Sequence, residues 1–252
     1  IEINYFSDLP ARTGLGTSSS FVVGLLQALN AYRGNRVSSC RLAEEAVYVE
    51  REIIKEHVGL QDQYAAAFGG FNYIEFLPDG SVGVEKLVYR PGTVKNLQNN
   101  LLLFYTGIQR YSDSIQEKHV ANIEDNTEAL LGLKELAVQG RDILGSDDGD
   151  LDEFGELLHR GWELKRSLSA KISNPRLDEF YEKARHAGAL GGKLLGAGGG
   201  GFLLFYVPPD RQEGVRGSLS DLLEVNFSFE KIGSQVIFFD PDKIGPPAQP
   251  SI

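Results

Sequence analysis

Glycine and hydroxyl side chains are concentrated in one segment whose spacing suits the binding of phosphate. Residues 10–20 read PARTGLGTSSS. Gly14 and Gly16 allow the backbone to approach a ligand and to adopt positive φ, and the N–H groups of a helix that begins there would point toward an anion. A hydroxyl at such a helix start is also placed to bind Mg²⁺ that bridges phosphate groups. An ordinary turn with a serine N-cap is the alternative.

A carboxylate motif follows in the same half of the chain. Asp62 lies between two glutamines, after a helix stop at Gly59, and Glu50 precedes Asp62 by twelve positions. A buried aspartate at this place could orient or deprotonate a hydroxyl group. The alternative is that Asp62 caps the short helix that follows it. Glu50 taken alone is typical of an exposed helix position.

A second glycine-rich segment, residues 196–201, follows Lys193 and directly precedes an apolar run. Because side chains are almost absent there, another segment of the chain or a ligand must approach the backbone closely, or the loop must be mobile. A flexible linker is the other interpretation. It is disfavoured because leucines and the apolar run flank the glycines, where linkers carry Ser or Pro.

These motifs need a scaffold, and hydrophobic periodicity predicts one that mixes helices and strands. Helices are expected from residue 18 to Gly34, from Ser38 or Ser39 to Gly59, over most of 112–187 with a break at Asn174 and Pro175, and over 210–223. Strands are expected at 1–5, 71–76, 81–89, 101–105, 202–207, 225–230 and 235–239. The order indicates an α+β fold rather than a strict alternation of strands and helices.

Composition limits the classes of function. A chain of 252 residues that is 42% hydrophobic can bury a core. Its 25 Lys and Arg against 35 Asp and Glu give a net charge of -10 without a long basic run, which argues against a nucleic-acid partner. One cysteine excludes an intramolecular disulfide, and four scattered histidines offer no zinc-ligand spacing. No apolar run is long enough to span a bilayer, so the expected location is the cytoplasm.

The three motifs together resemble those of the kinases named for galactokinase, homoserine kinase, mevalonate kinase and phosphomevalonate kinase, the GHMP kinases. Residues 10–20 resemble the family signature P-x-x-x-G-L-G-S-S-A-A, and residues 193–201 resemble its late motif K-x-x-G-A-G-x-G-G. The G-x-x-D-Q pattern at 59–63 is similar to that of the galactokinase-like sugar kinases. Hydroxyl residues stand where the signature has its first serine and its two alanines, which preserves the small size of these side chains.

This resemblance implies a two-domain α+β kinase. We expect residues 1–95 to be the remainder of an N-terminal, ribosomal protein S5 domain 2-like α/β domain that binds ATP. The family's first motif is missing from it, because the chain starts too late. Residues 96–252 are expected to form a ferredoxin-like C-terminal domain. Within the family, residues 9–20, 61–72 and 164–175 most closely resemble bacterial kinases of D-glycero-D-manno-heptose 7-phosphate.

The activity that this resemblance implies is direct in-line transfer of the γ-phosphoryl group of ATP to the anomeric hydroxyl of a sugar phosphate, giving the 1,7-bisphosphate of the heptose. Fucose, galactose or mevalonate as acceptor is the alternative within the family, and a ligand sensor without catalysis is the alternative outside it. A sensor does not need Ser18, Glu50 and Asp62 together, which favours catalysis. A homodimer is left open, and neither nucleic acid nor a membrane is expected as a partner.

The resemblance also implies roles for individual residues. Asp62 would face the accepting hydroxyl, as its base or as an orienting group, and Ser18 and Glu50 would hold Mg²⁺. ATP would be bound by the residues of two glycine segments, namely Gly14, Leu15, Gly16, Thr17, Ser18, Ser19, Gly196, Ala197, Gly198 and Gly199.

A phosphorylated acceptor needs cations of its own, because the chain is acidic overall. Lys165, Arg166 and Lys171 are candidates, in a stretch whose hydroxyls could add hydrogen-bond donors, and Arg12 in the first glycine segment is a fourth. The alternative is a solvated helix face, since Lys and Arg side chains are usually exposed.

Overall fold

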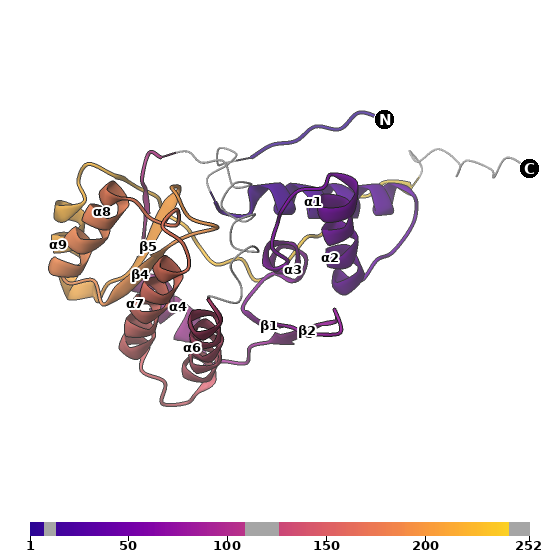
Figure 1. Cartoon of the computed structure of the whole chain (residues 1–252). Coiled ribbons are helices and arrows are strands. Elements are labelled where there is room, and N and C mark those ends of the chain that lie inside the picture. The colour runs from indigo at the N-terminus through magenta and orange to yellow at the C-terminus, as the bar shows by residue number, and fades with distance from the viewer. Residues whose placement is uncertain (8–13, 109–125, 242–252) are drawn as a thin grey trace, which may run out of the picture. The chain divides into compact units, whose positions relative to one another are not determined.

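The structure is a computed structural model that describes residues 1–7, 14–108 and 126–241 (Figure 1). The chain divides into two compact units. Residues 18–86 and 230–252 form the first, and residues 1–17 and 87–229 form the second. The division into domains at residues 95 and 96 remains a proposal, since these units group segments that are distant in sequence.

The first unit is built from helices and one hairpin. Its elements are α1 (Thr17–Tyr32), α2 (Ser39–Tyr48), the π-helix η1 (Val49–Ile53), α3 (Gln61–Phe68), β1 (Asn72–Phe76) and β2 (Val82–Lys86). Ser38 caps α2 by accepting from the Arg41 N–H at 3.3 Å, as the sequence predicts. Apolar side chains from three helices form the core, including Val23, Leu42 and Tyr64. The hairpin β1–β2 packs beside it through Ile74 and other partly buried residues.

A returning C-terminal segment crosses the end of α3 at very short range. The Gly70 N–H donates to the Glu230 carbonyl at 2.9 Å, and the Ser234 N–H donates to the Ala66 carbonyl at 2.8 Å. A Cβ atom on Gly69, where φ is +58°, would lie 2.2 Å from the backbone nitrogen of Gly233. Glycines on both of the crossing segments therefore permit a backbone contact that any side chain would prevent.

The second unit contains a four-stranded antiparallel sheet with the order β4-β5-β3-β6. The strands are β3 (Leu101–Tyr105), β4 (Gly191–Leu194), β5 (Phe202–Tyr206) and β6 (Leu223–Glu224). Helices α6 (Thr127–Gly145), α7 (Leu151–Ser167) and α8 (Pro175–His186) connect β3 to β4, and α9 (Gln212–Ser218) connects β5 to β6. This β-α-β-β-α-β order is the ferredoxin-like topology that the family resemblance implies. The short helices α4 (Thr93–Asn99) and η2 (Pro209–Arg211) also belong to the described part of this unit.

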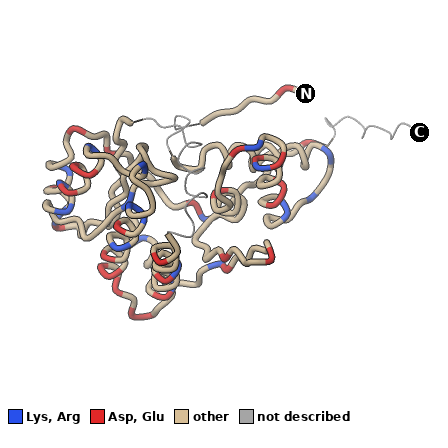
Figure 2. Tube along the Cα trace, in the orientation of Figure 1, with Lys and Arg blue, Asp and Glu red and all other residues tan. Residues whose placement is uncertain are grey.

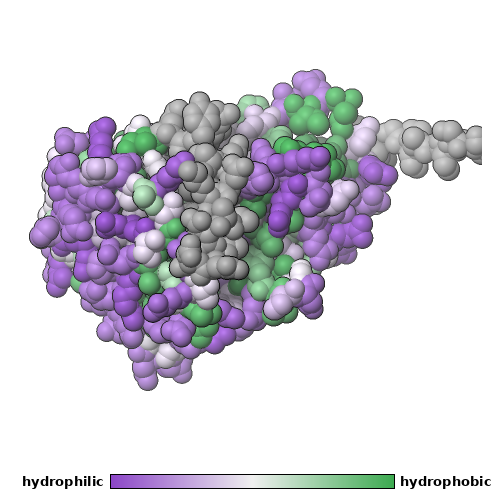
Figure 3. Space-filling model, viewed as in Figure 1, coloured by the Kyte–Doolittle hydropathy of each residue, from purple (hydrophilic) through white to green (hydrophobic). Residues whose placement is uncertain are grey.

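Helices pack on this sheet around large aromatic side chains. Trp162, Tyr181 and Phe205 are fully buried, and the Tyr181 ring on α8 contacts both the Trp162 ring on α7 and the Phe205 ring on β5. Asn174 begins α8 by accepting from two backbone N–H groups at 3.1 Å, which explains the predicted break before Pro175. Hydrophilic residues cover most of the visible face around α8 and α9 (Figure 3).

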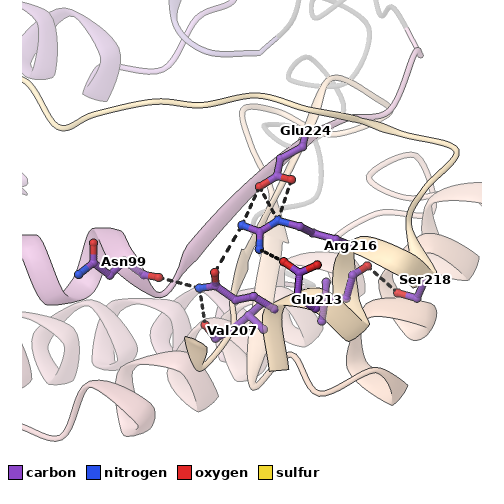
Figure 4. A network of polar contacts seen from close by, with 8 residues as sticks. Asn99, Val207, Glu213, Arg216, Ser218 and Glu224 are labelled. Atoms are coloured by element: carbon purple, nitrogen blue, oxygen red, sulfur yellow. Dashed lines mark hydrogen bonds and ion pairs between the residues drawn. The ribbon is translucent and has the colours of Figure 1, made fainter. Parts of the chain in front are cut away.

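A polar network fixes the edge strand β6 to α9 (Figure 4). The Arg216 guanidinium donates to both carboxylate oxygens of Glu224, at distances from 2.9 to 3.1 Å, and to Glu213 at 2.9 Å. Gln212 donates to the Asn99 carbonyl at 2.6 Å and to the Val207 carbonyl at 3.2 Å. These contacts tie α4, the end of β5, α9 and β6 together, so we assign the network to the fold.

Several expected elements differ from the structure. Residues 225–230 form no strand. The Val225 N–H still donates to the Leu103 carbonyl of β3 at 2.8 Å, and beyond it the Gln98 side chain donates to the Phe227 carbonyl and accepts from the Phe229 N–H. Residues 1–5 and 235–239 form no strand and are largely exposed. Strand β4 was not expected, since its first two residues are glycines with low strand propensity. The helix expected over 210–223 is limited to η2 and α9.

Charge and hydropathy can be followed along the described residues. Acidic and basic residues are interspersed along the helices of both units (Figure 2). Within residues 1–7, 14–108 and 126–241, no helix is both long enough and apolar enough to cross a bilayer.

Candidate functional site

The first glycine segment leads directly into α1. Gly14 and Gly16 have φ values of +84° and +67°, and α1 begins at Thr17. The first turn of this helix carries no acidic side chain, so its N–H groups and dipole retain their positive character toward an anion. Residues 8–13, with the candidate Arg12, lie outside the described residues. The described part of the segment therefore has the backbone conformation that a phosphate cradle needs.

A buried polar cluster joins α1 to two other elements of the same unit. Ser19 Oγ lies 3.0 Å from each carboxylate oxygen of Glu50, and the Gln63 side-chain amide donates to the same carboxylate. All three side chains are buried, and Glu50 is 0% exposed. Burial raises the pKa of Glu50, while the hydrogen bonds from Gln63 and Ser19 act in the opposite direction. We call Ser19, Glu50 and Gln63 the carboxylate cluster.

Local backbone structure explains how Glu50 reaches the interior. After α2 the chain continues as the π-helix η1, which contains Glu50. The wider turn of a π-helix interrupts the helical register, a feature that is frequent at functional sites. Lys55 follows with φ of +62°, a left-handed conformation that ends the helix. The regular surface-helix position that the sequence indicates for Glu50 is thus absent.

The structure associates Ser19 with Glu50, whereas the sequence predicts Ser18 as the partner ligand. Ser18 is exposed, and Ser19, one position later in α1, points into the unit. Sequence reasoning also missed Gln63 as a cluster member. The available signals were the run of hydroxyls from Thr17 onward and the two amides that flank Asp62.

The residues of the cluster fit Mg²⁺ in their chemistry. They provide hydroxyl, carboxylate and amide oxygens, which are the hard ligands that this ion prefers. The Oε1 atom of Gln63 is buried and has no hydrogen-bond partner among the described residues, so this oxygen is available as a further ligand. The described residues hold no group of three or more His, Cys, Asp or Glu side chains suited to a metal. Such a sparse set is typical of Mg²⁺ that also binds substrate phosphates.

Asp62 lies next to this cluster in the first turn of α3 and is half-buried. The N-cap of α3 is Leu60, which makes no side-chain capping bond, so Asp62 is not the N-cap of the helix. Gln61 donates to an Asp62 carboxylate oxygen at 3.3 Å. The negative charge of Asp62 also contributes, after burial, to the raised pKa of Glu50. Asp62 therefore combines partial exposure with a fixed helical position, as a group that acts on a substrate hydroxyl requires.

In the second unit, residues 195–201 connect β4 to β5, and two chain segments approach the backbone of this glycine loop. The Gly199 N–H donates to the Ile172 carbonyl and the Gly201 N–H donates to the Ile108 carbonyl, both at 2.9 Å. A Cβ atom on Gly198 would lie 2.8 Å from Ile172 Cα, and one on Gly200 would lie 2.5 Å from the Ile108 carbonyl oxygen. Close approach by the chain itself accounts for these two glycines.

The three candidate cations of residues 164–171 have different surroundings. Lys165 donates to the backbone carbonyls of Leu194, at the end of β4, and of Gly196 in the glycine loop. Arg166 is paired with Glu163 at 3.3 Å and Asp178 at 3.5 Å, and it lines a polar groove of about 740 Å³ formed by α7 and α8. Lys171 is exposed, and its ammonium has no partner among the described residues. It directly precedes the segment that bonds the glycine loop.

Lys193 is a further lysine beside this loop, on β4. It is half-buried and has no hydrogen-bond or ion-pair partner within the described part of the chain. Burial lowers its pKa. The sequence places it in the late motif but gives it no role.

Comparison with known proteins relates both halves of the chain to one family. The family model described as "GHMP kinases N terminal domain" matches residues 1–70, and "GHMP kinases C terminal" matches residues 134–224. A D-glycero-alpha-D-manno-heptose 7-phosphate kinase of Campylobacter jejuni is 33% identical over 212 residues, covering 83% of this chain and 62% of that protein. A galactokinase of Pyrococcus furiosus is 29% identical over 237 residues, covering 82% and 64%.

A solved structure shows the same likeness. The crystal structure of a D-glycero-D-manno-heptose 1-phosphate kinase from Bacteroides thetaiotaomicron has a TM-score of 0.70 and 32% sequence identity, covering 90% of this chain and 64% of that chain. This chain thus spans less than two thirds of the length of the relatives named here.

Proposed function

This chain belongs to the GHMP kinase family, and we propose that it catalyses ATP-dependent phosphorylation of a sugar phosphate. The observation that carries the proposal is Asp62, half-exposed at the start of α3 and adjacent to the carboxylate cluster, whose Ser19 lies at the start of α1. Residues 18–86 thus hold a candidate proton acceptor and oxygen ligands for Mg²⁺, and the glycine segment suited to phosphate directly precedes them in the chain. The similarity to heptose phosphate kinases favours a phosphorylated sugar as the acceptor.

In the proposed reaction, the acceptor hydroxyl oxygen forms a bond to the γ-phosphorus of ATP while the bond from that phosphorus to the bridging oxygen breaks. Asp62 orients the hydroxyl and accepts its proton. Backbone N–H groups of residues 14–19 bind phosphate oxygens. Glu50 together with the hydroxyl of Ser18 or Ser19 would hold Mg²⁺, which neutralises charge on the phosphates when it is bound. Residues 196–199 are the proposed second set of ATP ligands.

We further propose that the acceptor is D-glycero-D-manno-heptose 7-phosphate and that the anomeric hydroxyl is phosphorylated. Its existing phosphate requires a cation, and Lys171 is the best placed of the candidates, because it is exposed beside the glycine loop and unpaired among the described residues. Arg166 and Arg12 remain additional candidates for this phosphate. Lys165 was a candidate on the same grounds, but its contacts with the backbone carbonyls of Leu194 and Gly196 support a different role.

A kinetic comparison tests the acceptor. We expect Lys171→Met to raise KM for the sugar phosphate about tenfold, the scale of one lost charge-assisted hydrogen bond, and to leave KM for ATP within twofold. Lys134→Met, which removes an exposed lysine of α6, is the matched control. Equal use of the sugar phosphate and its unphosphorylated sugar by the unaltered protein would contradict a phosphorylated acceptor.

A further inference from the structure

Lys165 bonds the start of the glycine loop through two backbone carbonyls. Its Nζ atom lies 3.2 Å from the Leu194 carbonyl oxygen and 2.5 Å from the Gly196 carbonyl oxygen. Leu194 is the last residue of β4, and Gly196 is the first glycine of the run. An ammonium group has three donors and no acceptor, so it suits a pair of carbonyl oxygens.

The position of Lys165 in α7 supports this contact. Lys165 and Arg166 lie in the last turn of the helix, where a positive charge interacts favourably with the helix dipole. The side chain of Lys165 is partly buried, whereas the Lys171 side chain is exposed. Within the described residues, Lys165 is the one cation of residues 164–171 whose side chain bonds the loop backbone.

Because the peptide bond is planar, this contact also fixes the direction of one N–H group of the loop. The Gly196 carbonyl and the Ala197 N–H belong to one planar trans peptide, so they point in opposite directions. With the Gly196 carbonyl held on Lys165, the Ala197 N–H is directed away from the ammonium. Neither the Gly196 N–H nor the Ala197 N–H has a hydrogen-bond partner in the described part of the structure. Successive free N–H groups of this kind form an anion-binding concavity.

We propose that Lys165 is a positioning residue that fixes the peptide between Gly196 and Ala197, so that the loop presents its N–H groups to a phosphate group of ATP. Lys165 then acts through the loop backbone and does not contact the acceptor's phosphate. This inference rests on the proposed function for its ligand, while the positioning itself is a property of the unliganded chain.

Hydrogen–deuterium exchange of the unliganded full chain tests the positioning. Lys165→Met retains an unbranched side chain of similar length and removes the charge and the donors. We expect exchange in the peptide covering residues 195–201 to rise at least about tenfold, because two bonds to a charged donor are lost. Lys171→Met, the neighbouring lysine without a loop contact, should leave exchange in this peptide unchanged.

Steady-state kinetics of the same variants separate positioning from direct substrate binding. For Lys165→Met we expect a lower kcat and a KM for ATP raised about tenfold, with KM for the sugar phosphate within twofold. For Lys171→Met we expect the reverse, with KM for the sugar phosphate raised about tenfold and KM for ATP within twofold. If Lys165→Met does not fold, as judged by circular dichroism, Lys165→Gln replaces it with the same expectations. Unchanged loop exchange together with a raised KM for the sugar phosphate would overturn the proposal. Absence of turnover in the unaltered protein would instead contradict the proposed function and leave the exchange result as the test of positioning.

Discussion

At residue scale, Glu50 and Asp62 have different surroundings, and these surroundings suit the two different roles that we propose for them. Glu50 is fully buried, bonded by Ser19 and Gln63, and has a raised pKa because of its burial. Asp62 is half-buried and stands at a helix start. A carboxylate that binds a metal needs fixed geometry, and one that acts on a substrate hydroxyl needs access.

Asp62→Asn preserves size and removes the charge of the proposed proton acceptor. We expect kcat to fall by roughly two orders of magnitude or more, the usual scale for a positioned acid–base group, with the fold retained. The measurement is steady-state turnover of ATP with a sugar phosphate. Asp221→Asn, at an exposed position of the other unit, is the control. Wild-type turnover by Asp62→Asn would remove Asp62 from the mechanism.

A double-mutant cycle identifies the serine that acts with Glu50. The variants are Ser19→Ala, Ser18→Ala, Glu50→Gln and the two corresponding double mutants. Because Ser19 bonds Glu50 and Ser18 is exposed, we expect a coupling energy above about 0.5 kcal/mol for Ser19 with Glu50 and near zero for Ser18 with Glu50. Urea unfolding without Mg²⁺ gives these values. Coupling confined to Ser18 would contradict the arrangement of the carboxylate cluster.

Lys193 gives a prediction in which the sign of the pH dependence can be checked. Its pKa in the folded protein is lowered by burial, so just below pH 10.5 the unfolded chain binds more protons than the folded one. The free energy of unfolding should therefore rise with pH in the range just below pH 10.5. Lys193→Met should raise the free energy of unfolding at pH 7 and reduce this rise. A loss of stability at pH 7 in this variant would show that the ammonium has a stabilising partner.

At the scale of elements, the crossing of α3 by residues 230–234 is the most demanding packing feature of the first unit. Gly233→Ala would place a Cβ 2.2 Å from the Ala67 carbonyl oxygen. We expect this change to lower the free energy of unfolding by about 1–3 kcal/mol, as overpacking does. Gly24→Ala in α1 is the control, because a Cβ there meets nothing within 4 Å and alanine favours a helix. Equal stability of Gly233→Ala and the unaltered protein would exclude the close crossing.

Elements whose bounds are set by neighbouring residues were predicted from the sequence. Elements that depend on contacts between residues distant in the sequence were not. The cap at Ser38, the break at Asn174 and the strands at 101–105 and 202–206 follow from neighbouring residues. Strand β4 could not be predicted in this way, because pairing with β5 offsets the low propensity of its glycines. The backbone that follows β6 bonds the side chain of Gln98, which lies more than a hundred positions away.

In the candidate site, too, features set by local sequence were predicted, and features that depend on how elements pack were not. Spacing and family resemblance indicated the glycine segments and Asp62, whose roles remain proposals. The contact of Glu50 with Ser19, and not with Ser18, was not predicted, because a difference of one residue on a helix depends on how the helix is rotated against its neighbours. The burial of Glu50 likewise depends on a π-helical turn that periodicity does not reveal.

At the scale of the whole molecule, a chain with net charge -10 is proposed to bind two phosphorylated ligands. The structure has local features that could bind phosphate groups without an overall positive charge. These are the start of α1 without acidic residues, the free N–H groups of Gly196 and Ala197, and the unpaired Lys171, all assessed within the described residues. Oriented N–H groups and single cations can bind anions on an acidic protein because their fields act at short range.

Phosphorus NMR of the full chain with ATP, Mg²⁺ and D-glycero-D-manno-heptose 7-phosphate tests the central claim most directly. The account predicts a new resonance from an anomeric phosphate ester, with one ADP formed for each ester, and no such resonance when Asp62→Asn replaces the unaltered protein over the same time. If the folded, unaltered chain forms neither ADP nor a new phosphate ester with this or any other sugar phosphate, the proposed kinase activity is contradicted.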